Sequence, residues 1–339
     1  MKTRIEQIEM AHGAGGKASR RLIEGLIAPA FANPALEPLS DAALLTFGGL
    51  RMATTADGFV VKPLQFPGGS IGSLAVHGTV NDLAVSGARP VALMATFILE
   101  AGLSGSVLER EVEAMAAAAR ESGVEIVGGD TKVVEHGLAD GMYVSTFGIG
   151  TVDERLILGA HQVREGDRVL LSGPIGDHGI TILLARGELE LEADIESDSR
   201  PVTRFVDAIS YRAAAGLRWM RDPTRGGVAT ALNELARDAQ VAVVLDEEAI
   251  PVRDAVRGAC ELLGLDPLHI ANEGQFLAIV AREYAQEALA AVRSVPGGRD
   301  ARIIGEIRSA PAGIVLTQTA YGGTRVVDML VGDPLPRIC

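Results

Sequence analysis

Cysteine, aromatic residues and positive charge are all scarce in this sequence, and each scarcity excludes a class of protein. Two cysteines among 339 residues cannot form a disulfide framework or a metal site made of several cysteines. Only 4% of the residues are aromatic, so few rings are left to stack against nucleic-acid bases. The formal net charge of −13 disfavours binding to phosphate backbones and to anionic membrane surfaces. We therefore expect no nucleic-acid partner and no membrane partner.

Long hydrophobic runs are missing as well. No uncharged apolar stretch reaches the roughly 18 residues that a membrane-spanning helix requires. Lys2, Arg4 and Glu6 stand where a signal peptide would have its apolar segment, so we expect a cytoplasmic protein. The 47% of hydrophobic and 22% of charged residues are typical of a globular protein, and the length predicts two domains.

Short apolar runs alternate with segments of helical periodicity, which predicts an α/β or α+β fold. Residues 107–122 carry apolar side chains at helical spacing and stop at Gly123. Two further helices are predicted, one around 228–235 and one that ends at Gly264. Short buried strands are predicted at 125–127, 169–171, 276–280 and 314–316.

The chain divides most naturally near residue 155. Strand-like sequence ending at Gly150 gives way there to a charged connection and then to a new strand at Arg168. We predict an N-terminal domain over 1–154, a C-terminal domain over 155–331 and a tail over 332–339. Pro334 and Pro336 exclude a helix in the tail and favour an extended, mobile segment.

A glycine-rich segment near the N-terminus carries Gly15, Gly16 and Lys17. It resembles a phosphate-binding loop, but Ala11 and Ala18 occupy positions where the P-loop pattern needs a glycine and a hydroxyl group. The segment is therefore either a flexible loop that closes over phosphates or an ordinary connection.

Four aspartates stand where an apolar or strand-like run meets a turn. They are Asp41, Asp57, Asp82 and Asp130. Magnesium binds through a few carboxylates together with phosphate oxygens, so convergent aspartates would let an acidic protein hold a nucleotide. Each aspartate taken alone is better explained as a helix cap or a turn former. Their joint occurrence beside glycines favours a site for metal and nucleotide.

Other polar residues occupy positions suited to chemistry. Lys132 follows the same turn as Asp130, where its ammonium would neutralise a phosphoryl group or accept a proton, unless it is a solvated surface lysine. Glu273 precedes a predicted buried strand, either as a catalytic carboxylate or as part of a turn. The segment 173–179, between a predicted strand and a helix expected to start at Ile180, offers free amides to an anion. The arginines of 221–227 would clamp phosphate or pair with acids.

The two cysteines differ in their surroundings. Cys260 shares an apolar helical stripe with Val256 and Leu263, which indicates a packing role. Cys339 is the last residue of the sequence and follows the proline-containing tail, a placement suited to a thiol that carries a covalent group between sites. A chance placement is the alternative.

Taken together, these motifs resemble the HypE family of hydrogenase maturation factors over nearly the whole chain. The segments that carry the resemblance are 12–17, 55–58 with its continuation to Gly69, 81–84, 128–134, 176–179, 222–227, 272–275 and 336–339. Several are shared with the wider family of aminoimidazole ribonucleotide synthetase, thiamine-phosphate kinase and selenophosphate synthetase. The ending Pro-Arg-Ile-Cys is specific to the HypE family. Selenophosphate synthetases carry a reactive cysteine or selenocysteine near the N-terminus, whereas this chain has no cysteine before Cys260.

The resemblance implies an N-terminal α/β domain whose strands pair with a second subunit in a dimeric β-barrel, and a C-terminal α+β domain with a mixed sheet. It assigns Gly15, Gly16, Lys17, Asp57, Asp82 and Asp130 to ATP, and Asp41, Asp57, Asp82 and Asp130 to Mg²⁺. The family often has two adjacent acids where this chain has Ser40 and Asp41, which makes the metal role of that segment less secure.

The implied reaction is the ATP-dependent dehydration of a carbamoyl group on Cys339 to a thiocyanate, from which cyanide passes to the iron of a nickel-iron hydrogenase. Phosphorylation of the amide oxygen would create a leaving group, with Lys132 and Glu273 as candidates for stabilising charge and moving the proton. The implied partners are a second copy of the chain, the carbamoyltransferase HypF as donor and a HypC–HypD complex as cyanide acceptor.

Two other functions stay open at this point. One is a kinase or amidine-forming synthetase in which Cys339 is incidental, so that its activity would survive removal of the tail. The other is a scaffold for metal-cluster assembly factors, which would turn over no ATP.

Overall fold

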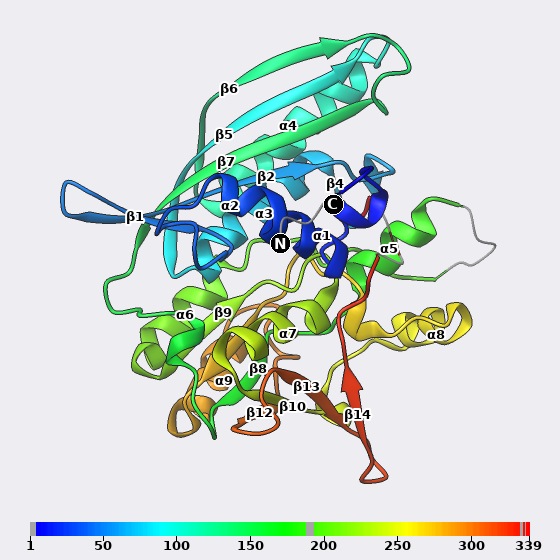
Figure 1. Ribbon diagram of the computed structural model, residues 1–339. Coiled ribbons are helices and arrows are strands. Elements are labelled where there is room, and N and C mark those ends of the chain that lie inside the picture. Colours follow the sequence, from blue (N-terminus) through cyan, green and yellow to red (C-terminus); the bar gives the residue numbers. More distant parts are fainter. Residues whose placement is uncertain (1–4, 188–192, 333–334, 336) are drawn as a thin grey trace.

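The computed structural model describes residues 5–187, 193–332, 335 and 337–339. Pro334 and Pro336, on which the expectation of an extended tail depended, lie outside these residues, as do Lys2 and Arg4. Two large sheets, one in each half of the chain, form the framework on which the helices pack (Figure 1). The predicted α/β (α+β) class is confirmed.

The first sheet has five strands in the order β1 (Ala43–Phe47), β2 (Leu50–Phe59), β7 (Met142–Val152), β5 (Ala88–Glu100) and β6 (Glu125–Val134). Neighbours are antiparallel except β5 and β6, which are parallel. A parallel pair needs a crossover connection, which α4 (Gly105–Ser122) supplies. This helix ends at Gly123, as predicted, and the φ of +68° at Gly123 is a left-handed conformation that favours glycine.

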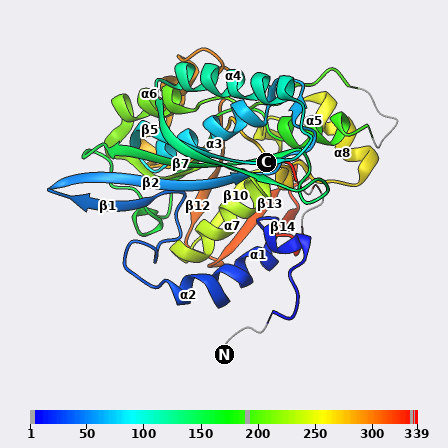
Figure 2. The same ribbon diagram turned by 90° about the horizontal axis from the view of Figure 1, so that it is seen from above.

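The described residues cover one face of the first sheet and leave the other face exposed. α3 (Ile71–Val85) and α4 pack against each other over one face (Figure 2), where Leu74, Leu93 and Val144 belong to one core. On the opposite face Met94 and Ile98 are exposed. Such alternation along β5 is what a sheet with one covered face requires. The uncovered apolar face fits the expected dimeric β-barrel, which stays a prediction.

The structure corrects the burial of one predicted strand. Residues 125–127 begin β6, but they are exposed rather than buried. β6 is an edge strand with one hydrogen-bonded neighbour, so the apolar side chains of Val127 and Val133 have no layer of the same chain over them. An apolar run indicates that the side chains of a strand pack against another layer of protein. It does not indicate whether that layer belongs to the same chain.

The second sheet has seven strands in the order β14 (Thr324–Val327), β13 (Ile314–Gln318), β10 (Ala242–Asp246), β12 (Arg302–Arg308), β8 (Arg168–Leu171), β11 (Leu277–Val280) and β9 (Leu217–Arg221). β10 and β13 are parallel and the other neighbours are antiparallel, so the predicted mixed sheet is confirmed. The strands predicted at 169–171, 276–280 and 314–316 are β8, β11 and β13.

Helices lie on both faces of the second sheet. α7 (Gly227–Ala239) covers one face, where its Leu232 shares a core with Val169 of β8. α6 (Thr203–Ala213) and α9 (Ala285–Arg293) cover the other face, where Ile209 shares a core with Leu170. Because adjacent residues of β8 point to opposite faces, this short strand is buried on both sides. The helices predicted around 228–235 and before Gly264 are α7 and α8 (Asp254–Leu263).

Shorter elements complete the described chain. They are the 3-10 helix Met10–Gly13, α1 (Lys17–Leu22), the π-helical turn Ile23–Ile27, α2 (Ala28–Ala30), β3 (Gln65–Phe66), β4 (Gly69–Ser70), α5 (Asp177–Ala185) and the 3-10 turns Ala160–Gln162, Ala214–Gly216, Glu247–Ala249, Pro267–His269 and Arg282–Tyr284. The predicted domain boundary falls in the connection between β7 and β8 and stays a prediction. Within the described ranges, no helix combines the length and the apolar character needed to cross a membrane.

The contact between α3 and α4 generates a prediction about stability. A Cβ atom at Gly72 would lie 2.1 Å from the carbonyl oxygen of Glu111, so Gly72→Ala should lower the free energy of unfolding by about 1–3 kcal/mol through overpacking. Gly258→Ala is the matched control, because nothing lies within 4 Å of that position and alanine favours the helix. Urea unfolding of both variants tests this, and equal effects would contradict the assigned contact.

Candidate active site

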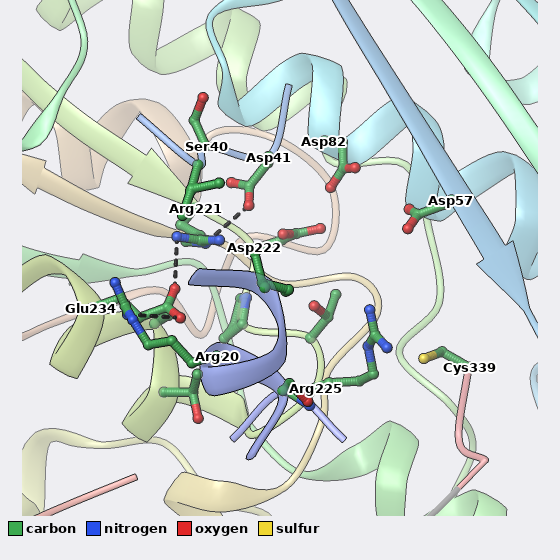
Figure 3. Close-up of a pocket in the computed structure, with 18 of the residues that line it drawn as sticks. Arg20, Ser40, Asp41, Asp57, Asp82, Arg221, Asp222, Arg225, Glu234 and Cys339 are labelled. Carbon is green, nitrogen blue, oxygen red and sulfur yellow. Dashed lines mark hydrogen bonds and ion pairs between the residues drawn. The ribbon is translucent and has the colours of Figure 1, made fainter. Parts of the chain in front are cut away.

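A cleft of about 340 Å³ lies where the two halves of the chain meet. Its walls come from the glycine-rich N-terminal segment and α1, from β2 and α3, from the turn between β9 and α7, and from the tail. Figure 3 shows the carboxylates of Asp41, Asp82 and Asp222 facing one another across this space. Residues that are far apart in the sequence therefore share one concave surface.

Three carboxylates form a compact group in the cleft. Asp41 precedes β1, Asp82 lies in the last turn of α3 and Asp222 directly follows β9. One oxygen from each lies within 4.8 Å of the others. The threonine hydroxyl of Thr55 on β2 donates to Asp82 Oδ2 at 2.7 Å, which fixes one side of the group. Several carboxylate oxygens at this spacing are the donor set that a hard divalent cation such as Mg²⁺ prefers.

Burial and mutual repulsion disfavour the charged forms of these aspartates. Burial raises the pKa of Asp82 and of Asp222 well above the usual range, and neighbouring carboxylates raise both further. Burial also raises the pKa of Asp41, to about 6, although Arg221 opposes this shift. The group carries more negative charge than its surroundings compensate, and a divalent cation would supply the missing positive charge.

Arginines hold the acidic group in place on one side. Arg221 Nε lies 2.9 Å from Asp41 Oδ1, and Arg221 Nη1 lies 2.9 Å from Glu234 Oε2. Arg20 of α1 reaches the same glutamate, with Nη1 3.1 Å from Oε1 (Figure 3). The arginines of 221–227 were expected either to bind phosphate or to pair with acidic residues. Arg221 pairs with acidic residues.

The predicted metal ligands only partly coincide with this group. Asp57 of β2 lines the cleft, and burial raises its pKa, but it is not one of the three mutually close carboxylates. Asp222 was missing from the expected ligands. It follows a strand and precedes the Gly226-Gly227 start of α7, which is the same pattern that indicated the other aspartates, so the signal was present in the sequence.

Asp130 and Lys132 lie elsewhere in the described chain. Both are on β6, are exposed, and form an ion pair with 2.5 Å between Lys132 Nζ and Asp130 Oδ2. Neither is among the residues that line the cleft. The fold of one chain thus does not bring these two residues to the three-carboxylate group, because β6 is the far edge of the first sheet.

The N-terminal glycines do reach the cleft. Gly15 has a φ of +79°, and a Cβ there would lie 2.8 Å from the carbonyl oxygen of Arg225. A Cβ at Gly16 would lie 2.3 Å from the carbonyl oxygen of Leu330. Glycine is therefore required by close backbone approach. Lys17 instead forms an ion pair with Asp328, 2.5 Å from Nζ to Oδ2, and is not among the residues that line the cleft.

Glu273 and Cys339 complete the cleft. Glu273 is 3% exposed, and burial raises the pKa of its carboxyl group well above the usual range, with further contributions from neighbouring acids. Its Oε1 has no hydrogen-bond partner within the described part of the chain. Cys339 is half-buried and lines the same cleft, with its sulfur directed toward Arg225 (Figure 3). Cys260 is buried in a hydrophobic core, as predicted.

The two domains define the class of the protein. Residues 39–152 match the N-terminal domain of AIR synthase related proteins, and residues 164–317 match their C-terminal domain. A carbamoyl dehydratase HypE of Azotobacter vinelandii is 52% identical over 332 residues, which cover 98% of this chain and 97% of that protein. The chain therefore belongs to the HypE family within the AIR synthase related proteins, and the resemblance stated from the motifs is confirmed.

Solved structures of the family agree with this assignment. A crystal structure of a HypE–HypF complex contains a chain that is 44% identical, with a TM-score of 0.87 and coverage of 91% of this chain and 99% of that one. A HypE solved in complex with ATP is 47% identical, with a TM-score of 0.82 and coverage of 98% and 100%. The prediction that the chain is an enzyme of this family is confirmed.

The carboxylate group generates a prediction about cations and pH. A raised folded-state pKa means that stability is highest while the acids are protonated and falls as pH rises through that pKa, which is about 6 for Asp41. Mg²⁺ binding to the ionised group should therefore raise the unfolding temperature more near pH 7.5 than near pH 5.5. Asp82→Asn should stabilise the metal-free protein near pH 7.5 and weaken the Mg²⁺ effect.

Calorimetric melting with Mg²⁺ and with a chelator checks this expectation. Asp246→Asn is the control, because Asp246 is exposed at the end of β10 and asparagine can still accept from the Glu248 amide. A Mg²⁺ shift that is equal in both variants and at both pH values would refute the assignment of the cation site.

Proposed function

We propose that this protein dehydrates a carbamoyl group carried on the sulfur of Cys339, using ATP and Mg²⁺, and so forms a thiocyanate. The observation that carries the proposal is that Cys339 lines the same cleft as the three-carboxylate group and the buried Glu273. The relatives named carbamoyl dehydratase, and the one solved with ATP, support the choice of reaction.

Three aspartates, Asp41, Asp82 and Asp222, would hold Mg²⁺, with Asp57 beside them. Bound Mg²⁺ would neutralise charge on the triphosphate and orient it for in-line transfer. Gly15 and Gly16 would cover the nucleotide, since their lack of side chains lets the backbone approach closely.

The proposed reaction has two steps, phosphorylation of the carbamoyl oxygen and then elimination of phosphate. The carbamoyl oxygen attacks the γ-phosphorus of ATP, ADP leaves, and the nitrogen loses one proton, which gives an imidate phosphate on the sulfur. The second N–H proton is then removed, the C–O bond breaks, and inorganic phosphate leaves as the C≡N bond forms. Burial raises the pKa of Glu273 well above its usual range, which increases the proton affinity of its carboxylate and makes it the candidate to accept such a proton.

Lys132 and Asp130 would act from a second copy of the chain. They lie on exposed β6, where Lys132 pairs with the exposed Ile98 of β5 and so belongs to the uncovered face that a partner sheet would cover. In a symmetric dimer each β6 would face the partner, so both sites would be completed in the same way. There Lys132 would stabilise charge that develops on the phosphoryl group.

The proposal also includes the protein that donates the carbamoyl group and the complex that accepts the cyanide. HypF would donate the carbamoyl group, in line with the relative solved as a HypE–HypF complex. A HypC–HypD complex would accept the cyanide, for delivery to the iron of a nickel-iron hydrogenase. This exchange would take place in the cytoplasm.

Replacing each cysteine in turn tests whether Cys339 carries the carbamoyl group and Cys260 serves only in packing. Wild-type protein given HypF with a carbamoyl donor and ATP should gain a carbamoyl group at Cys339 and then lose one water from that adduct, as followed by mass spectrometry. Cys339→Ala should form no adduct and still bind ATP. Cys260→Ala is the control, with unchanged chemistry because Cys260 is 2% exposed. An adduct on Cys260, or thiocyanate formation without Cys339, would disprove the proposal.

Mixed dimers test whether Lys132 acts across the interface. Lys132→Ala alone should slow single-turnover dehydration by about a hundredfold or more. A heterodimer of one Lys132→Ala chain and one Cys339→Ala chain should recover about half of the wild-type activity, because one of its two sites is complete. Co-purification with two affinity tags provides the heterodimer. If it is as inactive as the Lys132→Ala homodimer, Lys132 does not act on the partner's site.

A further inference from the structure

The motif at 176–179 has a structural position that the proposed reaction does not explain. These residues start α5, and none of them is among the residues that line the cleft, so their amides do not bind an anion there. His178, in the first turn of α5, is 0% exposed. Its Nε2 lies 2.6 Å from the carbonyl oxygen of Ile338, the residue before Cys339. The motif therefore contacts the tail.

The hydrogen bonds of His178 define one tautomer. A carbonyl oxygen can only accept, so Nε2 carries the hydrogen and donates it to Ile338. Burial lowers the pKa of His178 to about 4, so the ring is neutral near pH 7 and Nδ1 accepts. The Ser197 hydroxyl, 2.7 Å away, donates to Nδ1, and its oxygen accepts from the Ser199 amide at 3.1 Å. This chain of donors keeps an N–H directed at the tail.

Backbone groups bind the carbonyls on either side. The Lys62 amide donates to the carbonyl oxygen of Arg337 at 3.2 Å, and the Val60 amide donates to a main-chain oxygen of Cys339 at 2.9 Å. The side chain of Ile338 is 1% exposed. Arg186 Nη2 also donates to the Arg337 carbonyl, at 2.9 Å. Each of the last three residues thus has its own donors, and His178 is the side chain that donates to the residue next to the cysteine. Although the tail was expected to be mobile, its end has a defined seat in this structure, and its mobility stays a prediction.

The absence of a side chain at Gly179 allows the tail to pack closely against the start of α5. A Cβ atom there would lie 2.5 Å from Ile270 Cγ2 and 3.3 Å from Leu335 Cδ1. The edge of the His178 ring is also packed against Phe66, with 5.6 Å between ring centroids and 86° between planes. The contact with Phe66 and the hydrogen bond from Ser197 therefore hold the ring in the orientation that directs Nε2–H at the tail.

We propose that His178 is a positioning residue, whose hydrogen bond to the carbonyl of Ile338 seats the tail and brings the Cys339 sulfur into the cleft. The inference rests on the proposed function, because it names the residue that presents the carrier thiol to the phosphoryl donor. His178 does not line the cleft, so it acts through the tail and takes no part in proton transfer.

The test measures the seating of the tail and the reaction separately. In a Cys260→Ala background, the rate at which iodoacetamide alkylates Cys339 reports how often the tail leaves its seat. His178→Phe keeps a ring and removes the donor, whereas His178→Gln keeps a donor near the same place. The control is His269→Phe, because the His269 ring also bonds a carbonyl oxygen through Nε2, 2.9 Å from that of Asp328, and has no hydrogen bond to Ser197 or Ser199 among the described residues.

We expect His178→Phe to alkylate roughly tenfold faster than wild type, the factor that corresponds to a lost hydrogen bond of about 1.4 kcal/mol. Single-turnover dehydration should fall by a similar factor, with the KM for ATP unchanged. His178→Gln should recover most of both rates, and His269→Phe should behave as wild type. Equal alkylation of the two phenylalanine variants would overturn the inference.

Two further results are decisive. If His178→Phe does not fold, Ser197→Ala removes the donor that selects the tautomer, and it must also speed alkylation for the inference to stand. If wild-type protein alkylates as expected but never dehydrates its carbamoyl group, the proposed function fails while the seating role of His178 survives. The two failures are therefore distinguishable.

Discussion

Repulsion among carboxylates at the junction of the two sheets is the constraint on which the rest of the site depends. Asp41, Asp82 and Asp222 are held within 4.8 Å of one another, and Arg221 compensates only part of their charge. Burial raises the pKa of Glu273, and Asp222 of this group raises it further. Arrival of a cation would relieve the repulsion and lower that pKa. Metal binding and the proton affinity of Glu273 are therefore linked through one electrostatic field.

Keeping these charges together requires firm connections between the two halves of the chain. Asn81, next to Asp82 on α3, donates to the carbonyl oxygen of Glu273 at 3.1 Å and accepts from the Val202 amide at 2.8 Å. Asp198 accepts from the amide of Glu273 at 3.0 Å. The backbone of Glu273 is thus bound on both sides. These contacts set the position of the glutamate relative to the aspartate helix, which neither domain would do alone.

Regular patterns of residues along the sequence explain which elements of the fold and of the site could be predicted. Helical periodicity and glycine stops located α4, α7 and α8, and apolar runs located β8, β11 and β13, because those signals arise from neighbours in the chain. Aspartates at strand ends indicated much of the carboxylate group for the same reason. The burial of β6 was mispredicted, since its exposure depends on strand order, which local sequence does not encode.

The sequence by itself determined the family, the α/β (α+β) fold class and most of the chemistry-bearing residues, because side-chain type and local spacing are written directly in it. Only the tertiary structure decided which of them meet. It brought in Asp222, left Asp130 and Lys132 on an outer edge strand, and seated Ile338 on His178. Such contacts join residues distant in the chain through strand order and close backbone approach, so no short pattern can specify them.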